Sequence, residues 1–233
     1  MTALLEGRGI RKVYAGGDGR PLEVLGGVDI DVHRGELIAV VGASGAGKST
    51  LLHLLGALDR PSAGDVWLEG SRYADLGPPG LAELRNRKLG FVFQFHHLLR
   101  EFSALENVMM PLLIGGVAVR EAQSRAEEKL SAVGLAGRMA HRPAELSGGE
   151  QQRCAVARAL VHDPSLVLAD EPSGNLDHAS SERLHELLFR LAREYETAVV
   201  IVTHNRQLAG RADRILWLED GRLTVVRSVD AIP

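Results

Sequence analysis

The octapeptide at 42–49, GASGAGKS, constrains the fold of this chain more than any other feature of the sequence. It fits the pattern G-x-x-x-x-G-K-[ST]. The residues before it, Leu37–Val41, are apolar on both faces, which is typical of a parallel strand that helices cover on each side. The apolar run after it, Leu51–Leu58, has helical character. Strand, glycine-rich loop and helix, in this order, predict a phosphate-binding loop.

The residue types of this loop suit a chain of phosphate groups. Glycines let the backbone approach closely, and successive N–H groups and the helix N-terminus point at the anion. Lys48 is expected to reach the β- and γ-phosphates of a nucleotide, and the Ser49 hydroxyl is expected to hold Mg²⁺. The residues predicted to bind the nucleotide here are Gly42, Ala43, Ser44, Gly45, Ala46, Gly47, Lys48, Ser49 and Thr50.

Other segments place this loop in an α/β fold. The apolar runs Leu166–Ala169 and Val199–Val202 predict two more buried strands, and a leucine repeat over 179–192 predicts an amphipathic helix. We expect short strands within 3–33, mostly helical structure over 81–162 and a closing hairpin near the end of the chain. Because buried strands alternate with helices, the sequence favours a largely parallel sheet.

Composition excludes several classes of protein. Apolar residues make up 45% and charged residues 24% of the chain, which is the balance of a soluble globular protein. The 27 Lys and Arg against 30 Asp and Glu give a net charge of −3, which excludes a strong basic footprint for nucleic acid. Cys154 is the one cysteine, so an internal disulfide is excluded and a reducing cytosol is favoured. No run of about eighteen apolar residues exists, so no membrane-spanning helix is expected.

Two carboxylates, Asp170 and Glu171, follow the predicted strand at 166–169. Ligands of parallel sheets bind beyond the carboxyl ends of the strands. Asp170 therefore suits Mg²⁺ binding through water, and Glu171 suits the base that orients or deprotonates an attacking water. The alternative is that the two carboxylates only cap a turn before Pro172.

A second anion site is predicted at 146–151, LSGGEQ. A serine and two glycines at the start of a predicted helix offer free N–H groups and a hydroxyl, although a simple N-cap would use the same residues. A kinase or GTPase needs only one phosphate site. A head-to-tail dimer would let each phosphate-binding loop face the second site of its partner.

Together these motifs resemble the ATP-binding subunit of an ABC transporter over essentially the whole chain. The loop at 42–49 is similar to the Walker A motif of that family, Val167–Glu171 to Walker B with its catalytic glutamate, and 146–151 to the ABC signature. The resemblance implies an α/β P-loop NTPase (RecA-like) parallel-sheet core, an N-terminal antiparallel β layer and an inserted α-helical subdomain. It implies one nucleotide-binding domain over 1–233, with the layer and core at about 1–95 and 163–228 and the helical subdomain at about 96–162.

The resemblance also gives roles to residues outside these motifs. Tyr14 matches the A-loop aromatic that stacks on adenine, and His204 matches the switch histidine near the γ-phosphate. Gln94 matches the Q-loop glutamine, which contacts Mg²⁺ and the attacking water. Asn205 stands after the histidine where the family commonly has Asp, and Ser173 stands where it commonly has Thr.

Three groups of site residues are thereby implied. The catalytic residues are Gln94, Glu171 and His204. The Mg²⁺ ligands are Ser49, Gln94 and Asp170. The residues at the dimer interface are the signature residues Ser147, Gly148, Gly149, Glu150 and Gln151, which contact the ATP of the partner subunit, and the D-loop residues Asn175, Leu176 and Asp177.

Residues 93–115 are similar to the lipoprotein-releasing type within the family. This stretch follows the Q-loop, where the family docks its membrane subunits. Its apolar face is a candidate groove for a partner's coupling helix, although ordinary core packing would use some of the same residues. The implied docking residues are Phe95, His96, Leu98, Leu99 and Phe102.

The resemblance implies a motor that uses ATP and Mg²⁺. Two ATP molecules are sandwiched in a homodimer of nucleotide-binding domains, closure moves two membrane subunits resembling LolC and LolE, and hydrolysis reopens the dimer. We therefore expect an ATPase peripheral to the cytoplasmic face of the bacterial inner membrane. It would drive release of outer-membrane-directed lipoproteins to a periplasmic carrier. It would contact this cargo only through the membrane subunits and bind no nucleic acid.

Alternative functions remain at this point. A MacB-like efflux ATPase or a cell-division ATPase shares the same motifs, so the lipoprotein hypothesis depends on 93–115. A soluble ABC ATPase that acts on DNA or ribosomes fits less well, because 50–146 holds no heptad run and the chain has one cassette. A small-molecule P-loop kinase leaves the signature and His204 unexplained.

Overall fold

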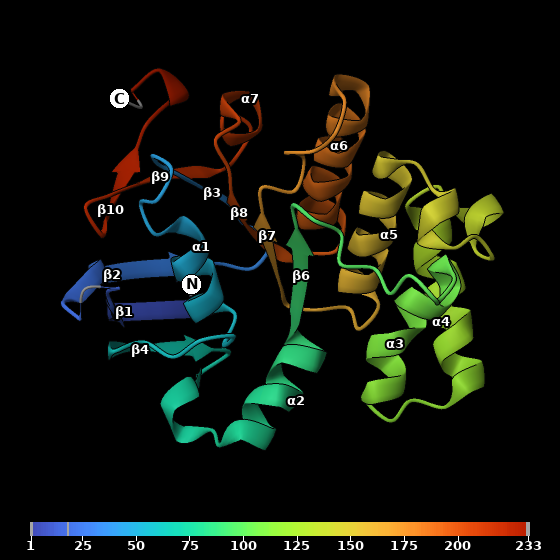
Figure 1. Ribbon diagram of the computed structural model, residues 1–233, viewed down its shortest axis with the longest axis horizontal. Coiled ribbons are helices and arrows are strands. Elements are labelled where there is room, and N and C mark those ends of the chain that lie inside the picture. Colours follow the sequence, from blue (N-terminus) through green and yellow to red (C-terminus); the bar gives the residue numbers. More distant parts are fainter. Residues whose placement is uncertain (1, 18, 232–233) are drawn as a thin grey trace. The chain divides into compact units, whose positions relative to one another are not determined.

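The computed structural model describes residues 2–17 and 19–231, except the side chains at 191 and 231. Its helices and strands are labelled in Figure 1. The chain divides into two compact units, each described by itself below. The sheet unit comprises Met1–Ala82 and Ala198–Pro233, and the helical unit comprises Glu83–Thr197.

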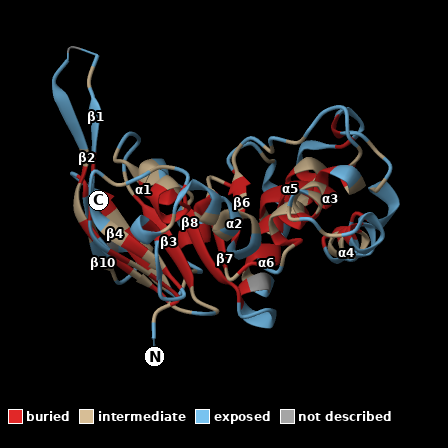
Figure 2. Ribbon diagram, turned by 90° about the horizontal axis from the view of Figure 1, so that it is seen from below, coloured by how far each residue is buried: buried red, intermediate tan, exposed pale blue. Residues whose placement is uncertain are grey.

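An antiparallel sheet opens the sheet unit, as predicted for the N-terminal layer. Its strand order is β2-β1-β4-β5, with β1 at Leu5–Ala15, β2 at Pro21–Val32, β4 at Ala63–Leu68 and β5 at Ser71–Arg72. The short strands expected within 3–33 are in fact one long hairpin, in which Leu5 pairs with Val32 and Ala15 with Pro21. Figure 2 shows that the far end of this hairpin is exposed.

A parallel sheet forms the core of the sheet unit. The central strand β3 (Leu37–Val41) pairs in parallel with β8 (Ala198–Val202) and with β9 (Arg214–Glu219). Every residue of β3 and β8 is buried (Figure 2), which explains why both read as continuous apolar runs. The predicted closing hairpin is confirmed as β9 with β10 (Arg222–Val226). Helices α1 (Lys48–Leu55) and α7 (Arg206–Ala209) follow β3 and β8.

The helical unit contains one parallel strand pair, β6 (Leu89–Phe93) and β7 (Leu166–Asp170), which run in register from Leu89 opposite Leu166 to Phe93 opposite Asp170. Its helices are α3 (Ala104–Ile114), α4 (Val119–Ala132), α5 (Gly148–Leu160) and α6 (His178–Glu194). The boundary between the units falls within α2 (Pro78–Lys88).

Close packing holds α5 on β6. A Cβ at Gly90 would lie 2.5 Å from the carbonyl oxygen of Ala159, so glycine is required where the helix crosses the strand. The predicted α/β class, antiparallel layer and helical insertion are thus confirmed. Within the described residues, no helix is both long enough and apolar enough to cross a bilayer.

Candidate nucleotide-binding site

The Walker A loop at 42–49 joins β3 to α1 within the sheet unit, as predicted. Gly47 is the N-cap of α1 and has a φ of 97°, a left-handed conformation that glycine adopts without strain. A Cβ at Gly42 would overlap the carbonyl oxygen of Leu218 in β9. Backbone conformation at one position and close approach at the other therefore require the two glycines of the motif.

The positive groups of the Walker A loop converge at the start of α1. Lys48 Nζ donates hydrogen bonds to the carbonyl oxygens of Gly42 and Ala43, each at 2.9 Å. Over Lys48–Leu55, the first turn has no side-chain cap and no acidic residue. Because the first N–H groups of a helix lack intrahelical partners and carry partial positive charge, this end of α1 suits an anion.

Tyr14, the predicted adenine-stacking residue, lies near the end of β1 and is 38% exposed. Its hydroxyl donates to Asp59 Oδ2 at 3.1 Å, and Lys12 Nζ lies 4.8 Å from the ring centroid. Burial raises the pKa of Asp59, but hydrogen bonds from Lys12, from Arg60 N and from Tyr14 outweigh it and lower that pKa. The ring is therefore fixed at its hydroxyl and at one face.

His204 lies at the same edge of the parallel sheet as the Walker A loop. Val40 of β3 is opposite Val202 of β8, so both segments begin just beyond the carboxyl ends of neighbouring parallel strands. Asn205 accepts a hydrogen bond from Leu208 N at 3.0 Å and caps α7. An amide therefore performs the capping that the more common Asp would perform.

In the helical unit, Gln94 and Glu171 directly follow β6 and β7 at one edge, because Phe93 is opposite Asp170. Gln94 Nε2 donates to Asn175 Oδ1, and Asn175 Nδ2 donates to the carbonyl oxygen of Gln94, both at 3.3 Å. The structure therefore joins the predicted Q-loop and D-loop residues by two hydrogen bonds.

Glu171 has a strained backbone. Its φ is 44°, a left-handed conformation that costs a residue with a Cβ roughly 1–2 kcal/mol. The turn after it is held at several points: Gly174 N donates to the carbonyl oxygen of Glu171 at 3.0 Å, and Ser173 Oγ lies 3.0 Å from Nε2 of the buried His185. Such strain persists only where the surroundings determine the conformation, and it concentrates at functional sites.

The signature motif starts α5, with Ser147 as its N-cap. Glu150 N donates to Ser147 Oγ at 3.3 Å, and Ser147 N donates to Glu150 Oε2 at 2.8 Å. The bond from Ser147 N, followed by that from Arg138, lowers the pKa of Glu150 to about 2. A Cβ at Gly149 would lie 2.8 Å from Ser180 Oγ of α6. The N-cap anticipated as an alternative is therefore real, and it fixes the helix end that the signature hypothesis requires.

Two more predicted interface residues have partners within the helical unit. Gln151 Nε2 donates to the carbonyl oxygens of Pro143 and Leu146, each at 3.0 Å. Asp177 Oδ1 accepts from Ser180 N at 2.9 Å, and hydrogen bonding to Ser180 lowers the pKa of Asp177. These side chains shape the signature and D-loop backbones.

Three of the predicted docking side chains are exposed: Phe95 at 64%, Leu99 at 41% and Phe102 at 37%. The backbone at Leu99 and Phe102 is fixed by the fully buried Asn107. Its Oδ1 accepts from Leu99 N at 2.7 Å, and its Nδ2, which has two hydrogens to donate, lies 2.9–3.1 Å from the carbonyl oxygens of Leu99, Phe102 and Ser103. An ordered loop thus presents apolar side chains at the surface.

The other two predicted docking residues, His96 and Leu98, are only partly exposed. Arg158 of α5 donates to the carbonyl oxygens of His96 and His97 at 2.9 and 2.7 Å. Burial is the main cause that lowers the pKa of His96. The docking segment is therefore tied to the C-terminal half of the signature helix through Arg158.

Sequence reasoning missed the polar residues that hold these loops, namely Asn107, Gln152 and Arg158. Arg158 bonds residues 61 and 62 positions away, and Gln152 bonds residues 59 and 20 positions away. No local pattern encodes such partners. The available signal was a polar residue on the apolar face of a predicted helix.

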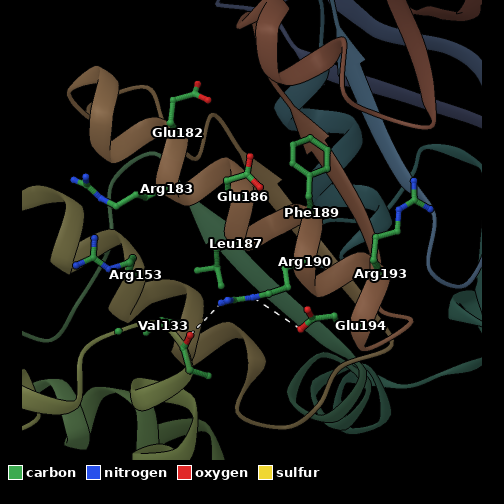
Figure 3. Close-up of a pocket in the computed structure, with 12 residues that line it drawn as sticks. Val133, Arg153, Glu182, Arg183, Glu186, Leu187, Phe189, Arg190, Arg193 and Glu194 are labelled. Carbon is green, nitrogen blue, oxygen red and sulfur yellow. Dashed lines mark hydrogen bonds and ion pairs between the residues drawn. The ribbon is translucent and has the colours of Figure 1, made fainter.

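A separate groove of about 880 Å³ lies beside α6 in the helical unit (Figure 3). Arg153 and Arg183 point to the same side of it in that view, and Arg190 donates to the carbonyl oxygen of Ala132 at 3.1 Å. Among the described residues that line the groove, none was predicted to bind nucleotide. The described residues also hold no group of three His, Cys, Asp or Glu side chains arranged for a metal ion.

Comparison with known proteins gives consistent relatives. Residues 25–174 match the ABC transporter family. The lipoprotein-releasing system ATP-binding protein LolD of Pseudomonas syringae pv. tomato is 54% identical over 221 residues, which covers 95% of this chain and 97% of that protein. LolD of Geobacter metallireducens is 55% identical over 223 residues, which covers 96% of this chain and 99% of that protein.

Solved structures agree with the fold. The dimeric structure of MJ0796, a bacterial ABC transporter cassette, matches with a TM-score of 0.86 at 38% identity and covers 94% of this chain and 96% of that one. A dimeric post-hydrolysis state of MJ0796 bound to ADP and Pi matches with the same TM-score at 37% identity and the same coverage. The predicted P-loop NTPase fold is therefore confirmed.

Proposed function

The chain belongs to the ABC transporter family, and from this premise we propose that it is the ATPase that drives lipoprotein release from the bacterial inner membrane. One observation carries the proposal: identity of 54–55% to LolD proteins over at least 95% of the chain. The matched region covers at least 95% of the chain and therefore includes the Walker A and signature motifs and the segment 93–115.

Nucleotide binding is assigned to the Walker A loop. Within the described residues, the start of α1 has no side-chain cap on its N–H groups, and Lys48 lies over the same loop through its bonds to Gly42 and Ala43. On binding, the Lys48 ammonium exchanges these two carbonyl oxygens for the β- and γ-phosphate oxygens. Tyr14 stacks on adenine with the ring face that does not lie against Lys12.

Hydrolysis is assigned to Glu171, Gln94 and His204. Glu171 accepts a proton from the attacking water as general base, and Gln94 orients that water through its amide. His204 donates a hydrogen bond to the γ-phosphate, where negative charge develops. Loss of such a base or charge-stabilising group costs about 10² to 10⁴ in rate.

The oxygen donors Ser49, Gln94 and Asp170 fit Mg²⁺, which prefers oxygen ligands and is held by one or two carboxylates together with substrate phosphates. The ion would neutralise charge on the phosphates. The side chains of the chain have the other roles: Lys48 binds the phosphates, Gln94 orients the attacking water and Glu171 accepts the proton of that water.

Dimerisation completes the site in this proposal. The N-capped start of α5, with Ser147, Gly148 and Gly149, contacts the γ-phosphate of the ATP bound by the partner subunit. The solved MJ0796 relatives are described as dimers, which supports this arrangement. The whole chain acts as one nucleotide-binding domain, with ATP closing the homodimer.

The ordered apolar loop around Phe95, Leu99 and Phe102 is assigned to membrane subunits resembling LolC and LolE. The fixed backbone and exposed apolar side chains suit a groove for an amphipathic coupling helix. The chain is then peripheral to the cytoplasmic face of the inner membrane and reaches the lipoprotein only through those subunits.

Co-purification tests the proposal. The tagged chain is recovered from detergent-solubilised membranes of its own cells, and the associated proteins are identified by mass spectrometry. We expect two related membrane proteins with large periplasmic domains, together with lipoprotein. An efflux or cell-division partner, or recovery with ribosomes or DNA, would overturn the assigned cargo.

A further inference from the structure

Gln152 bonds two functional loops at once. This residue of α5 is 1% exposed, and its Nε2 donates to the carbonyl oxygen of Phe93 at 3.1 Å and to that of Pro172 at 2.7 Å. Phe93 directly precedes Gln94, and Pro172 directly follows Glu171. One amide therefore fixes the backbone next to both residues that handle the attacking water.

Among the described residues, the Gln152 amide makes its hydrogen bonds through its N–H donors and not through its oxygen. Within the described part of the chain, the buried Gln152 Oε1 has no hydrogen-bond partner. Because burying an unpaired amide oxygen is unfavourable, packing alone would favour an apolar residue here. An apolar residue of the same shape would lose the two hydrogen bonds that Nε2 donates to Phe93 and Pro172.

The bond to Pro172 acts where the backbone is strained. Glu171 has its φ at 44°, and its carboxylate is the proposed base. A left-handed glutamate relaxes unless neighbouring contacts hold it. From α5, whose first residues belong to the signature motif, Gln152 holds the carbonyl group of Pro172, the residue after Glu171.

We propose that Gln152 is a positioning residue for ATP hydrolysis, tying the Gln94 loop and the Glu171 turn to the signature helix. The inference rests on the proposed roles of Glu171 and Gln94. Its consequence is that a displacement of α5 moves both loops together. Arg158 extends the same connection to the docking segment through the carbonyl oxygens of His96 and His97.

The test replaces the amide donor in the full-length protein. Gln152→Met keeps an unbranched side chain of similar size, and Gln152→Leu changes the packing as well as removing the donor. Gln123→Met on α4 is the matched control, because Gln123 is exposed and its amide bonds only Glu127 among the described residues. Single-turnover hydrolysis, nucleotide affinity and the urea midpoint are measured for each protein.

We expect Gln152→Met and Gln152→Leu to lower the hydrolysis rate by about 10- to 100-fold, since misplacement of a reacting group by about 1 Å costs about 100-fold. Nucleotide affinity should stay within about twofold, because Gln152 lies outside the Walker A loop. On a Glu171→Gln background, Gln152→Met should cause no further loss of rate. Gln123→Met should match the wild type.

Three outcomes would overturn the inference. The first is a folded Gln152→Met protein that hydrolyses ATP at the wild-type rate while Glu171→Gln is inactive. The second is a parallel fall of the hydrolysis rate, the nucleotide affinity and the urea midpoint of Gln152→Met, which would indicate a purely structural role. The third is wild-type hydrolysis by Glu171→Gln itself, which would remove the base assignment together with this inference.

Discussion

The buried amide of Asn107 supports the proposed docking loop, and its removal has a calculable cost. The side chain has one acceptor oxygen and two donor hydrogens, so it accepts one bond from Leu99 N and donates at most two to the three nearby carbonyl oxygens. At about 1 kcal/mol net per bond, Asn107→Ala should lower the free energy of unfolding by about 3 kcal/mol.

Two variants calibrate that figure. Asn107→Asp keeps the acceptor for Leu99 N, but it loses the donors and buries a carboxyl group beside three carbonyl oxygens, so it should cost at least as much as Asn107→Ala. Asn86→Ala removes a single bond, from Asn86 Nδ2 to the carbonyl oxygen of Pro111 at 3.0 Å, and should cost about 1 kcal/mol. Urea unfolding followed by circular dichroism measures all three.

The same variant tests function. Under conditions where Asn107→Ala is folded, it should bind nucleotide normally and recover less of the membrane subunits on co-purification, because Leu99 and Phe102 lose their fixed backbone. If Asn107→Ala lowers the free energy of unfolding by no more than Asn86→Ala does, the cost estimated from the number of Asn107 hydrogen bonds is refuted. Full recovery of the membrane subunits would refute the role of the ordered loop.

The remaining predictions concern the nucleotide and the signature helix. Lys48→Ala should weaken ATP binding measured by a fluorescent analogue, since a charge-assisted contact is worth about 1.5–3 kcal/mol, and unchanged affinity would contradict the phosphate-binding role. Tyr14→Ala should weaken binding of ATP, whereas Tyr14→Phe should retain it, because the ring stacks and the hydroxyl only bonds Asp59. The pKa of Glu150 lies at about 2, below the value of 4.5 for the free side chain, so its stabilisation is present above pH 4.5 and is lost as pH falls toward 2. Acid unfolding should therefore be steeper in the wild type than in Glu150→Gln over that window, and identical profiles would contradict the bonds from Ser147 N and Arg138 that lower this pKa.

The sequence predicts the elements that carry strong local signals. Leu37–Val41 and Val199–Val202 are apolar on both faces because the strands are buried on both faces, and the structure confirms them. The Walker A loop is predictable because its glycines and lysine are adjacent in the chain. Such local patterns suffice for the α/β class.

The sequence is a poor guide to elements whose burial is uneven and to contacts between residues far apart in the chain. The hairpin of β1 and β2 is longer than expected, because register shifts after Gly7, Ile10 and Lys12 interrupt the alternation. Helix α2 lacks a periodic signal, since Leu81 is its one buried residue. The partners of Gln152 become adjacent only after β6 and β7 pair.

ATP-driven release of lipoprotein tests the central claim most directly. The chain is reconstituted with its co-purified membrane subunits in proteoliposomes that carry lipoprotein, and release to a soluble acceptor is measured with ATP. We predict release by the wild type, and none by Glu171→Gln, which should bind ATP and accumulate as an ATP-dependent dimer. Hydrolysis without any release of lipoprotein by the wild type, or release by Glu171→Gln at the wild-type rate, would contradict the account.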